Sequence, residues 1–419
     1  MSIPDSAGTA KHASNASAVP RRGRQVDPAP PTAPVGRAIV VTRNLPPLVG
    51  GMERLVWHIV SELRAEYRVH VIGPAGCGKH LPDGVTASEV PIHPMLAYVL
   101  RTKVATLWQT LRLRPQLVVA GSGLTAPFAW LAARLTRGRC VVYLHGLDIE
   151  ARHPIYRMLW RPIFRHCDRV LVNSQFTRRL AQSAGIPEKR ITVLNPGVDL
   201  PNLRDAADQS VRFRHAYGLG NRPVLLYVGR ITARKGLSVF VRDILPQIID
   251  QQPDARLVVI GDEPAHALHH QSGERQRVTD ALASLNLDDR VLFLRCVDDN
   301  VLESAYFAAD VLVFPVQERR EDHEGFGMVA IEAAAHGLPT VAFASGGVPD
   351  AVSNGLSGDL ISPGDGVSFA RAVTRHLEGA GRTRGAQINT IRAFAKSFAW
   401  PVFGRKLRRL CHGPDKQSA

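Results

Sequence analysis

Two acidic residues at a fixed spacing are the strongest chemical feature of this sequence. Glu324 opens a glycine-rich segment, and Glu332 follows it in a predicted helix of Ala, Ile and Val. A carboxylate is almost never fully buried without a partner, so Glu332 needs one, and the two hydroxyl groups of a ribose would satisfy its oxygens. N–H groups at the start of this helix lie between the two acids and could bind phosphate or sugar oxygens. The alternative is that the two acids are unrelated.

Two cations stand upstream, in the segment G-R-I-T-A-R-K-G that follows a predicted strand at 224–228. Arg230 and Lys235 would lie together at the carboxyl end of that strand, beside the start of a helix. Two cations with free backbone donors suit a diphosphate. The alternative is a solvated basic loop, which is common in a chain with a formal net charge of +15.

The first half of the chain offers a histidine and a pair of glycines. His145 closes a predicted strand, where it could hydrogen-bond a substrate hydroxyl or transfer a proton. Alternatively, it belongs to a turn that Asp148 caps.

Gly50 and Gly51 follow the first predicted strand and would let a ligand approach the backbone near free N–H groups. A plain strand-to-helix turn would use the same glycines.

Two other kinds of site are not expected. Residues 121–126 match the relaxed dinucleotide fingerprint, but they follow the third predicted strand rather than the first of a βαβ pair, so a dinucleotide site is not indicated. No Asp-x-Asp motif occurs, and His323 and His336 have no Cys or His at ligand spacing. The sequence therefore predicts no metal site.

An α/β fold would position these residues. Short apolar runs alternate with helical patterns, which is typical of βαβ units whose strands are buried on both faces of a parallel sheet. We expect two doubly wound, Rossmann-like parallel-sheet domains facing each other across a cleft, because ligands bind beyond the carboxyl ends of such strands. The predicted strands are 38–42, 68–72, 117–120, 140–144, 169–172, 191–194, 224–228, 256–260, 291–294, 310–314 and 340–343.

The pattern divides the chain into four segments. We expect a disordered, basic and Pro-rich tail at 1–36, a first domain at 37–200, a second domain at 201–385 and a basic helix at 386–419. The uncharged run at 115–133 is long enough to suggest a transmembrane helix, but its glycines and proline favour a buried strand, a turn and a packed helix.

The composition narrows the class of protein. With 419 residues, 45% hydrophobic and 21% charged, the chain is neither wholly disordered nor collagen-like, and five scattered Cys indicate a reducing compartment. The excess of 52 Lys+Arg over 37 Asp+Glu favours acidic partners, but no nucleic-acid recognition module is visible.

Segments 95–114 and 156–169 mix aromatic and basic residues, as surfaces on an anionic membrane do. The alternative is core-packed helices with a solvated charged face.

These motifs, in this order, resemble those of the retaining glycosyltransferases of family 4, over about residues 37–400. The most specific is Glu-x7-Glu, here Glu324 and Glu332, in the context E-G-F-G…E-A-A-A-x-G-x-P-x-V, with G-R-x-x-x-x-K-G upstream. The resemblance implies the GT-B fold, with an acceptor-binding domain, a nucleotide-sugar-binding domain and a C-terminal helix that crosses back to the first. The charged residues at 319–323 depart from the family pattern.

The resemblance also implies roles for single residues. Arg230 and Lys235 would hold the diphosphate, Glu332 would bind the ribose, Glu324 would bind hydroxyls of the transferred sugar, and His145 would contact that sugar and assist the reaction. Backbone contacts to phosphate or sugar are expected from five further residues: Gly50, Gly51, Phe326, Gly327 and Met328.

The implied activity is transfer of a hexosyl group, mannose-like or related, from a GDP- or UDP-sugar to a glycan or lipid-linked acceptor. Surface polysaccharide, lipopolysaccharide or glycolipid synthesis would use such a reaction. The nucleoside diphosphate would depart through an oxocarbenium-like transition state, stabilised by cations and N–H groups and without cofactor or metal. We expect a cytoplasmic enzyme, peripheral on the inner face of the cytoplasmic membrane. The alternative is a sugar-nucleotide epimerase or a non-catalytic nucleotide-sugar-binding protein of the same architecture.

Overall fold

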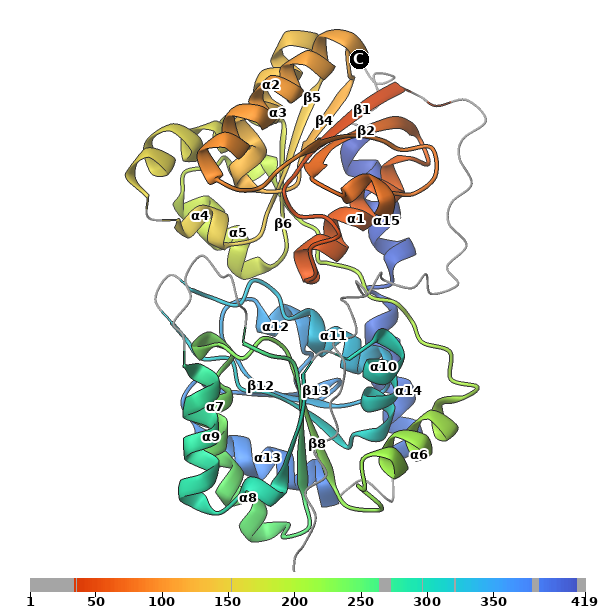
Figure 1. The fold of residues 1–419 in the computed structure, drawn as a ribbon, viewed down its shortest axis with the longest axis vertical. Coiled ribbons are helices and arrows are strands. Elements are labelled where there is room, and N and C mark those ends of the chain that lie inside the picture. The colour runs from red at the N-terminus through yellow and green to blue at the C-terminus, as the bar shows by residue number, and fades with distance from the viewer. Residues whose placement is uncertain are drawn as a thin grey trace, which may run out of the picture.

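Two parallel β-sheets, each with helices on both faces, form the two lobes of the molecule (Figure 1). The computed structural model describes residues 34, 36–151, 153–263, 273–295, 297–319, 322–378 and 384–412. The expected α/β fold with two parallel-sheet domains is confirmed. The tail predicted at 1–36 lies almost wholly outside the described residues.

The first sheet has seven strands in the order β3-β2-β1-β4-β5-β6-β7. Its strands are β1 Gly36–Val41, β2 Tyr67–Pro74, β3 Thr86–Val90, β4 Leu117–Ala120, β5 Arg139–Leu144, β6 Arg169–Val172 and β7 Ile191–Val193. Its helices are α1 Gly51–Leu63, α2 Met95–Leu113, α3 Ala126–Thr136, α4 Leu147–Glu150, α5 Gln175–Ser183 and the short η3 Tyr156–Trp160 and η4 Arg161–His166.

Side-chain alternation along the strands divides the core of the first domain into two layers. Along β1, Ala38 and Val40 pack on one face of the sheet, and Ile39 and Val41 pack on the other. The first layer includes α1 and α15 (Trp400–His412), and the second includes α2, α3 and η4. The run at 115–133 is divided into β4, a turn and the start of α3, and none of the described helices is both long and apolar enough to cross a bilayer.

The second sheet has six strands in the order β10-β9-β8-β11-β12-β13. These are β8 Val224–Val228, β9 Arg256–Ile260, β10 Val291–Leu294, β11 Val311–Phe314, β12 Thr340–Phe343 and β13 Gly358–Ile361. The helices are α6 Ala206–Ala216, α7 Leu237–Val239, α8 Leu245–Gln251, α9 Glu274–Leu285, α10 Asp299–Ala308, α11 Met328–Ala335, α12 Val348–Ala351, α13 Gly366–Glu378 and α14 Arg384–Lys396.

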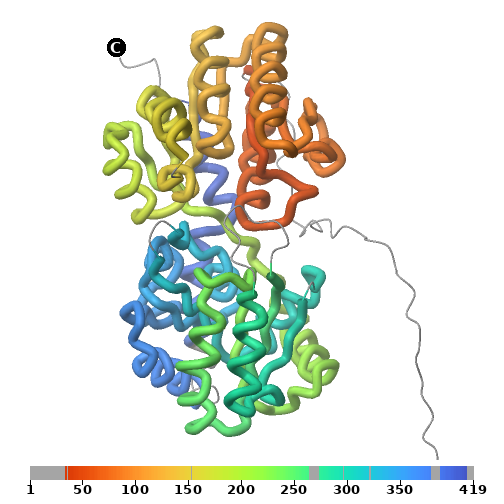
Figure 2. Tube along the Cα trace, turned by 60° about the vertical axis from the view of Figure 1, so that its left-hand side comes forward, coloured from red at the N-terminus to blue at the C-terminus, as the bar shows by residue number. Residues whose placement is uncertain are grey.

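The basic C-terminal segment forms two helices rather than one. α14 packs on the second domain, where Ile391 and Ala395 join the core beside α11. α15 then runs back along α1 of the first domain, as the blue segment in Figure 2 shows. Pro401 does not kink this helix, because it stands in the first turn, where its missing N–H costs no hydrogen bond.

The two chain crossings between the domains lie side by side. The Val198 N–H donates to the Phe398 carbonyl oxygen at 2.9 Å, and the Trp400 N–H donates to the Val198 carbonyl oxygen at 3.3 Å. The Trp400 ring is buried and stacks on His58 of α1, with 3.6 Å between ring centroids. A single paired segment, fixed to the first domain by Trp400, therefore joins the domains.

Candidate functional site

Loops at the carboxyl ends of the two sheets are in contact. Gly325, before α11, lies against the first domain, because a Cβ there would fall 2.6 Å from the Asn173 amide nitrogen and 2.6 Å from the His145 carbonyl oxygen. A Cβ on Gly51, at the start of α1, would fall 2.7 Å from Met328 Sδ. Residues without a side chain allow this approach. Predicted site residues from both halves of the chain thus meet at one interdomain surface.

Glu324 is held by two cations of its own domain. Lys235 Nζ lies 2.8 Å from Glu324 Oε2, and Arg234 donates to the same oxygen. Burial opposes ionisation of Glu324, but the charges of Arg234 and Lys235 outweigh it and bring its pKa to about 2. Burial lowers the pKa of Lys235, and Glu324 acts in the opposite direction. The acid and the lysine that the sequence pointed to therefore stabilise each other's charge.

Arg230 differs from Lys235 in its surroundings. Its side chain is exposed, and the Tyr227 hydroxyl donates to its carbonyl oxygen at 3.2 Å. Within the described parts of the chain, no carboxylate lies at ion-pair distance from the Arg230 guanidinium. Arg230 is thus a cation on the same loop that an incoming anion can contact.

Glu332 has partners on both domains. Arg54 of α1 places Nη1 2.7 Å from Glu332 Oε1, and the Tyr306 hydroxyl of α10 donates to Oε2 at 3.0 Å. The negative charge of Glu332 is the main cause of the raised pKa of Arg54. The carboxylate needs a partner, as the sequence indicated, and in this structure the protein supplies it.

His145 is 8% exposed and makes two hydrogen bonds of different kinds. Its backbone N–H donates to Asp148 Oδ2 at 3.0 Å, so the expected capped turn is present. Its Nε2 lies 2.9 Å from the Gly121 carbonyl oxygen. Because a carbonyl oxygen only accepts, Nε2 must carry a proton, and in the neutral ring Nδ1 is then an acceptor. The ring can therefore accept a hydrogen bond from a hydroxyl at Nδ1.

Two helices begin at this surface with glycines before their first turns. Gly50 precedes α1, and Gly327 precedes α11 with φ +100°, a conformation that favours glycine. The free N–H groups of both helices can bind an anion. Phe326 is 3% exposed and packs in the core with Phe398, so only its backbone is available to a ligand.

The charged loop before Glu324 also contacts the first domain. His323 Nδ1 lies 2.8 Å from Glu150 Oε1, and the His323 ring lies 4.7 Å from the ring of Phe176. Part of the loop, residues 320 and 321, lies outside the described residues. The described part is an interdomain contact rather than a free surface loop. Among the residues that the structure describes, no group of three or more His, Cys, Asp or Glu could hold a metal ion.

Three site residues are absent from the sequence-based prediction: Arg54, Arg234 and Tyr306. Arg54 follows the Gly50-Gly51 pair, and Arg234 lies inside the predicted basic loop, so position alone could have suggested both. Tyr306 carries no such signal, because it belongs to an amphipathic helix far from any motif.

If Glu332 binds a ribose, as the sequence predicts, the ribose hydroxyls compete with Arg54 for Glu332 Oε1, which predicts the effect of Arg54→Gln. The ion pair is partly exposed, and such pairs contribute about 0.2–1 kcal/mol, so the substitution should tighten GDP and UDP binding by up to about fivefold. Isothermal titration calorimetry measures the change in binding, with Arg68→Gln, at the exposed residue of β2, as the control. Weaker binding by Arg54→Gln would contradict the competition between Arg54 and the ribose.

Both halves of the chain match glycosyltransferase families. Residues 49–201 match the family described as Glycosyltransferase Family 4, and residues 222–379 match that described as Glycosyl transferases group 1. A Mycolicibacterium smegmatis protein, GDP-mannose-dependent alpha-(1-6)-phosphatidylinositol monomannoside mannosyltransferase, is 29% identical over 384 residues, 90% of this chain and 98% of the relative. The protein of the same name from Mycobacterium tuberculosis is 28% identical over 397 residues, 91% of this chain and 99% of the relative.

Solved structures of glycosyltransferases share the fold. HepE from Anabaena, solved in complex with UDP and glucose, superposes with a TM-score of 0.72 at 20% identity, covering 90% of this chain and 100% of that one. Sucrose-phosphate synthase from Thermosynechococcus elongatus gives a TM-score of 0.73 at 21% identity, covering 90% and 98%. The chain belongs to glycosyltransferase family 4 and is a glycosyltransferase with the GT-B fold.

Proposed function

We propose that this enzyme transfers a mannosyl group from GDP-mannose to a lipid-linked acceptor, with retention of the anomeric configuration. The observation that carries the proposal is the meeting of Lys235, Glu324 and Glu332 with the starts of α1 and α11 at one interdomain surface. The names of the two mycobacterial relatives support GDP-mannose and a glycolipid acceptor, since their similarity extends over nearly the whole chain.

Donor binding would exchange partners at the two acids. The ribose hydroxyls would replace Arg54 at Glu332, and the diphosphate would contact Arg230 and Lys235. Lys235 can serve Glu324 and a phosphate oxygen together, because its ammonium group has three N–H donors. Arg230 is exposed to an incoming anion, and a guanidinium group is weakly hydrated, so the desolvation free energy of this contact would be small. Glu324 would then accept hydrogen bonds from hydroxyls of the mannosyl ring.

The reaction would proceed on one face of the sugar. The bond between C1 and the diphosphate oxygen breaks, the acceptor hydroxyl oxygen bonds to C1 on the same face, and the hydroxyl proton passes to the departing phosphate oxygen. Arg230, Lys235 and helix N–H groups would stabilise the charge that grows on the leaving diphosphate. His145 would accept a hydrogen bond from a mannosyl hydroxyl at Nδ1 and so orient the ring. No step needs a metal or a cofactor.

Lys235→Ala and Glu324→Gln test this assignment. Each should lower kcat/KM for GDP-mannose by about 100-fold or more, because each removes a charged group next to the reacting sugar diphosphate. Transfer of radiolabelled mannose to extracted lipid gives the rate, circular dichroism checks the fold, and the exposed Glu318→Gln is the matched control. Full turnover by Glu324→Gln would remove that residue from the mechanism. Transfer from UDP-glucose but not from GDP-mannose would overturn the donor assignment.

A lipid-linked acceptor is supported by the unusual surface of α2. The residues of α2 that face the domain include Thr102, Thr106 and Thr110, each 0% exposed. The Thr106 and Thr110 hydroxyls donate to the carbonyl oxygens four residues earlier, at 2.7 and 2.6 Å. Tyr98 is buried beside them, and Met95, Val99 and Leu113 pack partly against the same core. Five other large apolar side chains of α2 point outward and are 55% to 72% exposed: Leu96, Leu100, Val104, Trp108 and Leu111.

An ordinary surface helix turns polar side chains outward, so an apolar stripe on the outer face of α2 is unusual. Exposed basic side chains accompany the apolar stripe: Arg101, Lys103, Arg112 and Arg114. A helix with an outward apolar face and flanking cations suits the surface of an anionic bilayer, and the chain's net charge of +15 is complementary to it. We therefore include peripheral attachment to an anionic membrane through α2 in the proposal.

Leu100→Gln combined with Trp108→Gln tests this attachment. The double variant should lose about tenfold or more in partition to vesicles of phosphatidylcholine and phosphatidylglycerol, because two large apolar side chains no longer enter the interface. Leu285→Gln with Val367→Gln, two exposed apolar positions on the second domain, is the control. Equal partition of both double variants would contradict attachment through α2. A wild-type dimer that Leu100→Gln with Trp108→Gln converts to monomer would assign the stripe to a second copy instead.

The proposal places the enzyme on the cytoplasmic side of that membrane. Cys77, Cys140, Cys167 and Cys411 are buried and form no disulfide in the structure, and the sulfurs of Cys140 and Cys167 lie 3.5 Å apart. Thiols of this kind suit a reducing compartment.

A further inference from the structure

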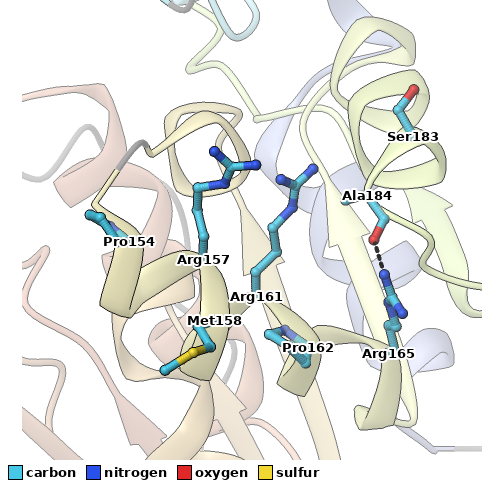
Figure 3. Close-up of a pocket in the computed structure, with 8 residues that line it drawn as sticks. All are labelled: Pro154, Arg157, Met158, Arg161, Pro162, Arg165, Ser183 and Ala184. Atoms are coloured by element: carbon cyan, nitrogen blue, oxygen red, sulfur yellow. Dashed lines mark hydrogen bonds between the residues drawn. The ribbon is translucent and has the colours of Figure 1, made fainter.

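A second concentration of positive charge lies on the first domain, away from the donor site. A pocket of about 550 Å³ opens between η3, η4 and the end of α5. Its lining is Pro154, Arg157, Met158, Arg161, Pro162 and Arg165 with Ser183 and Ala184 (Figure 3). α5 begins at the interdomain surface, where the Gln175 N–H donates to Asp350 at 2.9 Å, and ends at this pocket eight residues later. The helix length separates the two places by about 12 Å.

Three arginines of this pocket have no counter-charge. Arg157, Arg161 and Arg165 recur at every fourth residue, and no carboxylate of the described chain forms an ion pair with any of them. Arg165 donates to the Ala184 carbonyl oxygen at 2.9 Å, which fixes its guanidinium at the pocket wall. Figure 3 shows Arg157 and Arg161 side by side.

The local environment makes these charges costly. Arg161 Nε is shielded from solvent and has no hydrogen-bond partner among the described residues. Burial lowers the pKa of Arg161, and the charges of Arg157 and Arg165 lower it further. Like charges held together in a recess are stabilised when an anion binds between them. Guanidinium groups match phosphate oxygens with paired hydrogen bonds, so a phosphate group is the anion that this geometry fits.

The rim of the pocket is apolar and exposed. Met158 lines the pocket, and it and its neighbours Ile155 and Leu159, in or next to η3, are 52% to 69% exposed. η3 and η4 pack on the same face of the first sheet as α2, because Phe164 and Tyr156 join the core layer that also holds Tyr98. Guanidinium groups beside outward apolar side chains suit the boundary between phosphate and acyl layers of a bilayer.

We propose that the pocket of Arg157, Arg161 and Arg165 binds a phosphate group, and that this group belongs to an anionic lipid at the membrane surface. The proposal rests on the membrane attachment proposed above and adds to it a discrete site for a lipid head group. One site would thus bind the donor in the interdomain region, and another would orient the first domain on the bilayer that contains the acceptor.

The triple variant Arg157→Gln, Arg161→Gln, Arg165→Gln tests the site. Partition of the full chain is measured on vesicles of phosphatidylcholine alone and of an equal mixture with phosphatidylglycerol. The wild type should prefer the mixed vesicles, and the triple variant should lose about 10- to 100-fold of that partition. Arg204→Gln, Arg212→Gln, Arg371→Gln removes the same charge from exposed positions outside the first domain and should bind like the wild type. Equal losses of vesicle partition in both triple variants would mean that net charge alone causes the effect, and would overturn the site.

Two further measurements distinguish a lipid phosphate from a soluble phosphate, and the pocket proposal from the proposed mannosyl transfer. Thermal shift with inorganic phosphate tests a soluble ligand: stabilisation of the wild type but not of the arginine variant, together with unchanged vesicle binding, would overturn the lipid assignment. Thermal shift with GDP reports the donor site and the fold of each variant independently. Vesicle binding that Leu100→Gln with Trp108→Gln abolishes and the arginine variant retains would overturn the pocket alone. Absent GDP binding with intact lipid preference would overturn the proposed transfer alone.

Discussion

Buried carboxylates stay ionised only beside counter-charges, and this requirement organises the junction between the two domains. Glu324 is neutralised by Lys235 and Arg234 of its own domain. Glu332 is neutralised from the other domain by Arg54. The two acids therefore differ in their partners: the first pairs within its own domain, and the second adds an ion pair between the domains. In the proposed function, a diphosphate would share the first set of contacts and a ribose would replace Arg54 in the second.

The fold supplies the approach that these contacts need. Parallel strands bring every loop at their carboxyl ends to one edge, and the two edges face each other. Gly325 and Gly51 lie at the points of closest contact, where side chains would keep the domains apart. Both chain crossings pair at Val198, and Trp400 fixes that pair against α1. The chain thus passes between the domains at one place, beside α1.

The sequence predicts the fold well and the site in part. All eleven predicted strands exist. The two strands that were not predicted, β3 and β13, are edge strands with polar or charged residues (TASEV and GDLI), whereas the edge strands β7 and β10 carry apolar residues and were predicted. The motifs place Lys235 and Glu324 near each other, since both stand at strand ends of one sheet. The Arg54–Glu332 contact joins residues 278 positions apart, and Tyr306 reaches Glu332 from another helix. Such pairs depend on how the domains and helices pack, which spacing along the chain does not encode.

A crystal structure with bound GDP tests the central claim most directly. The account predicts the diphosphate about 3 Å from Lys235 and Arg230, the ribose hydroxyls at hydrogen-bond distance from Glu332, and Arg54 displaced from that carboxylate. GDP bound elsewhere, with the Arg54–Glu332 ion pair intact, would contradict it.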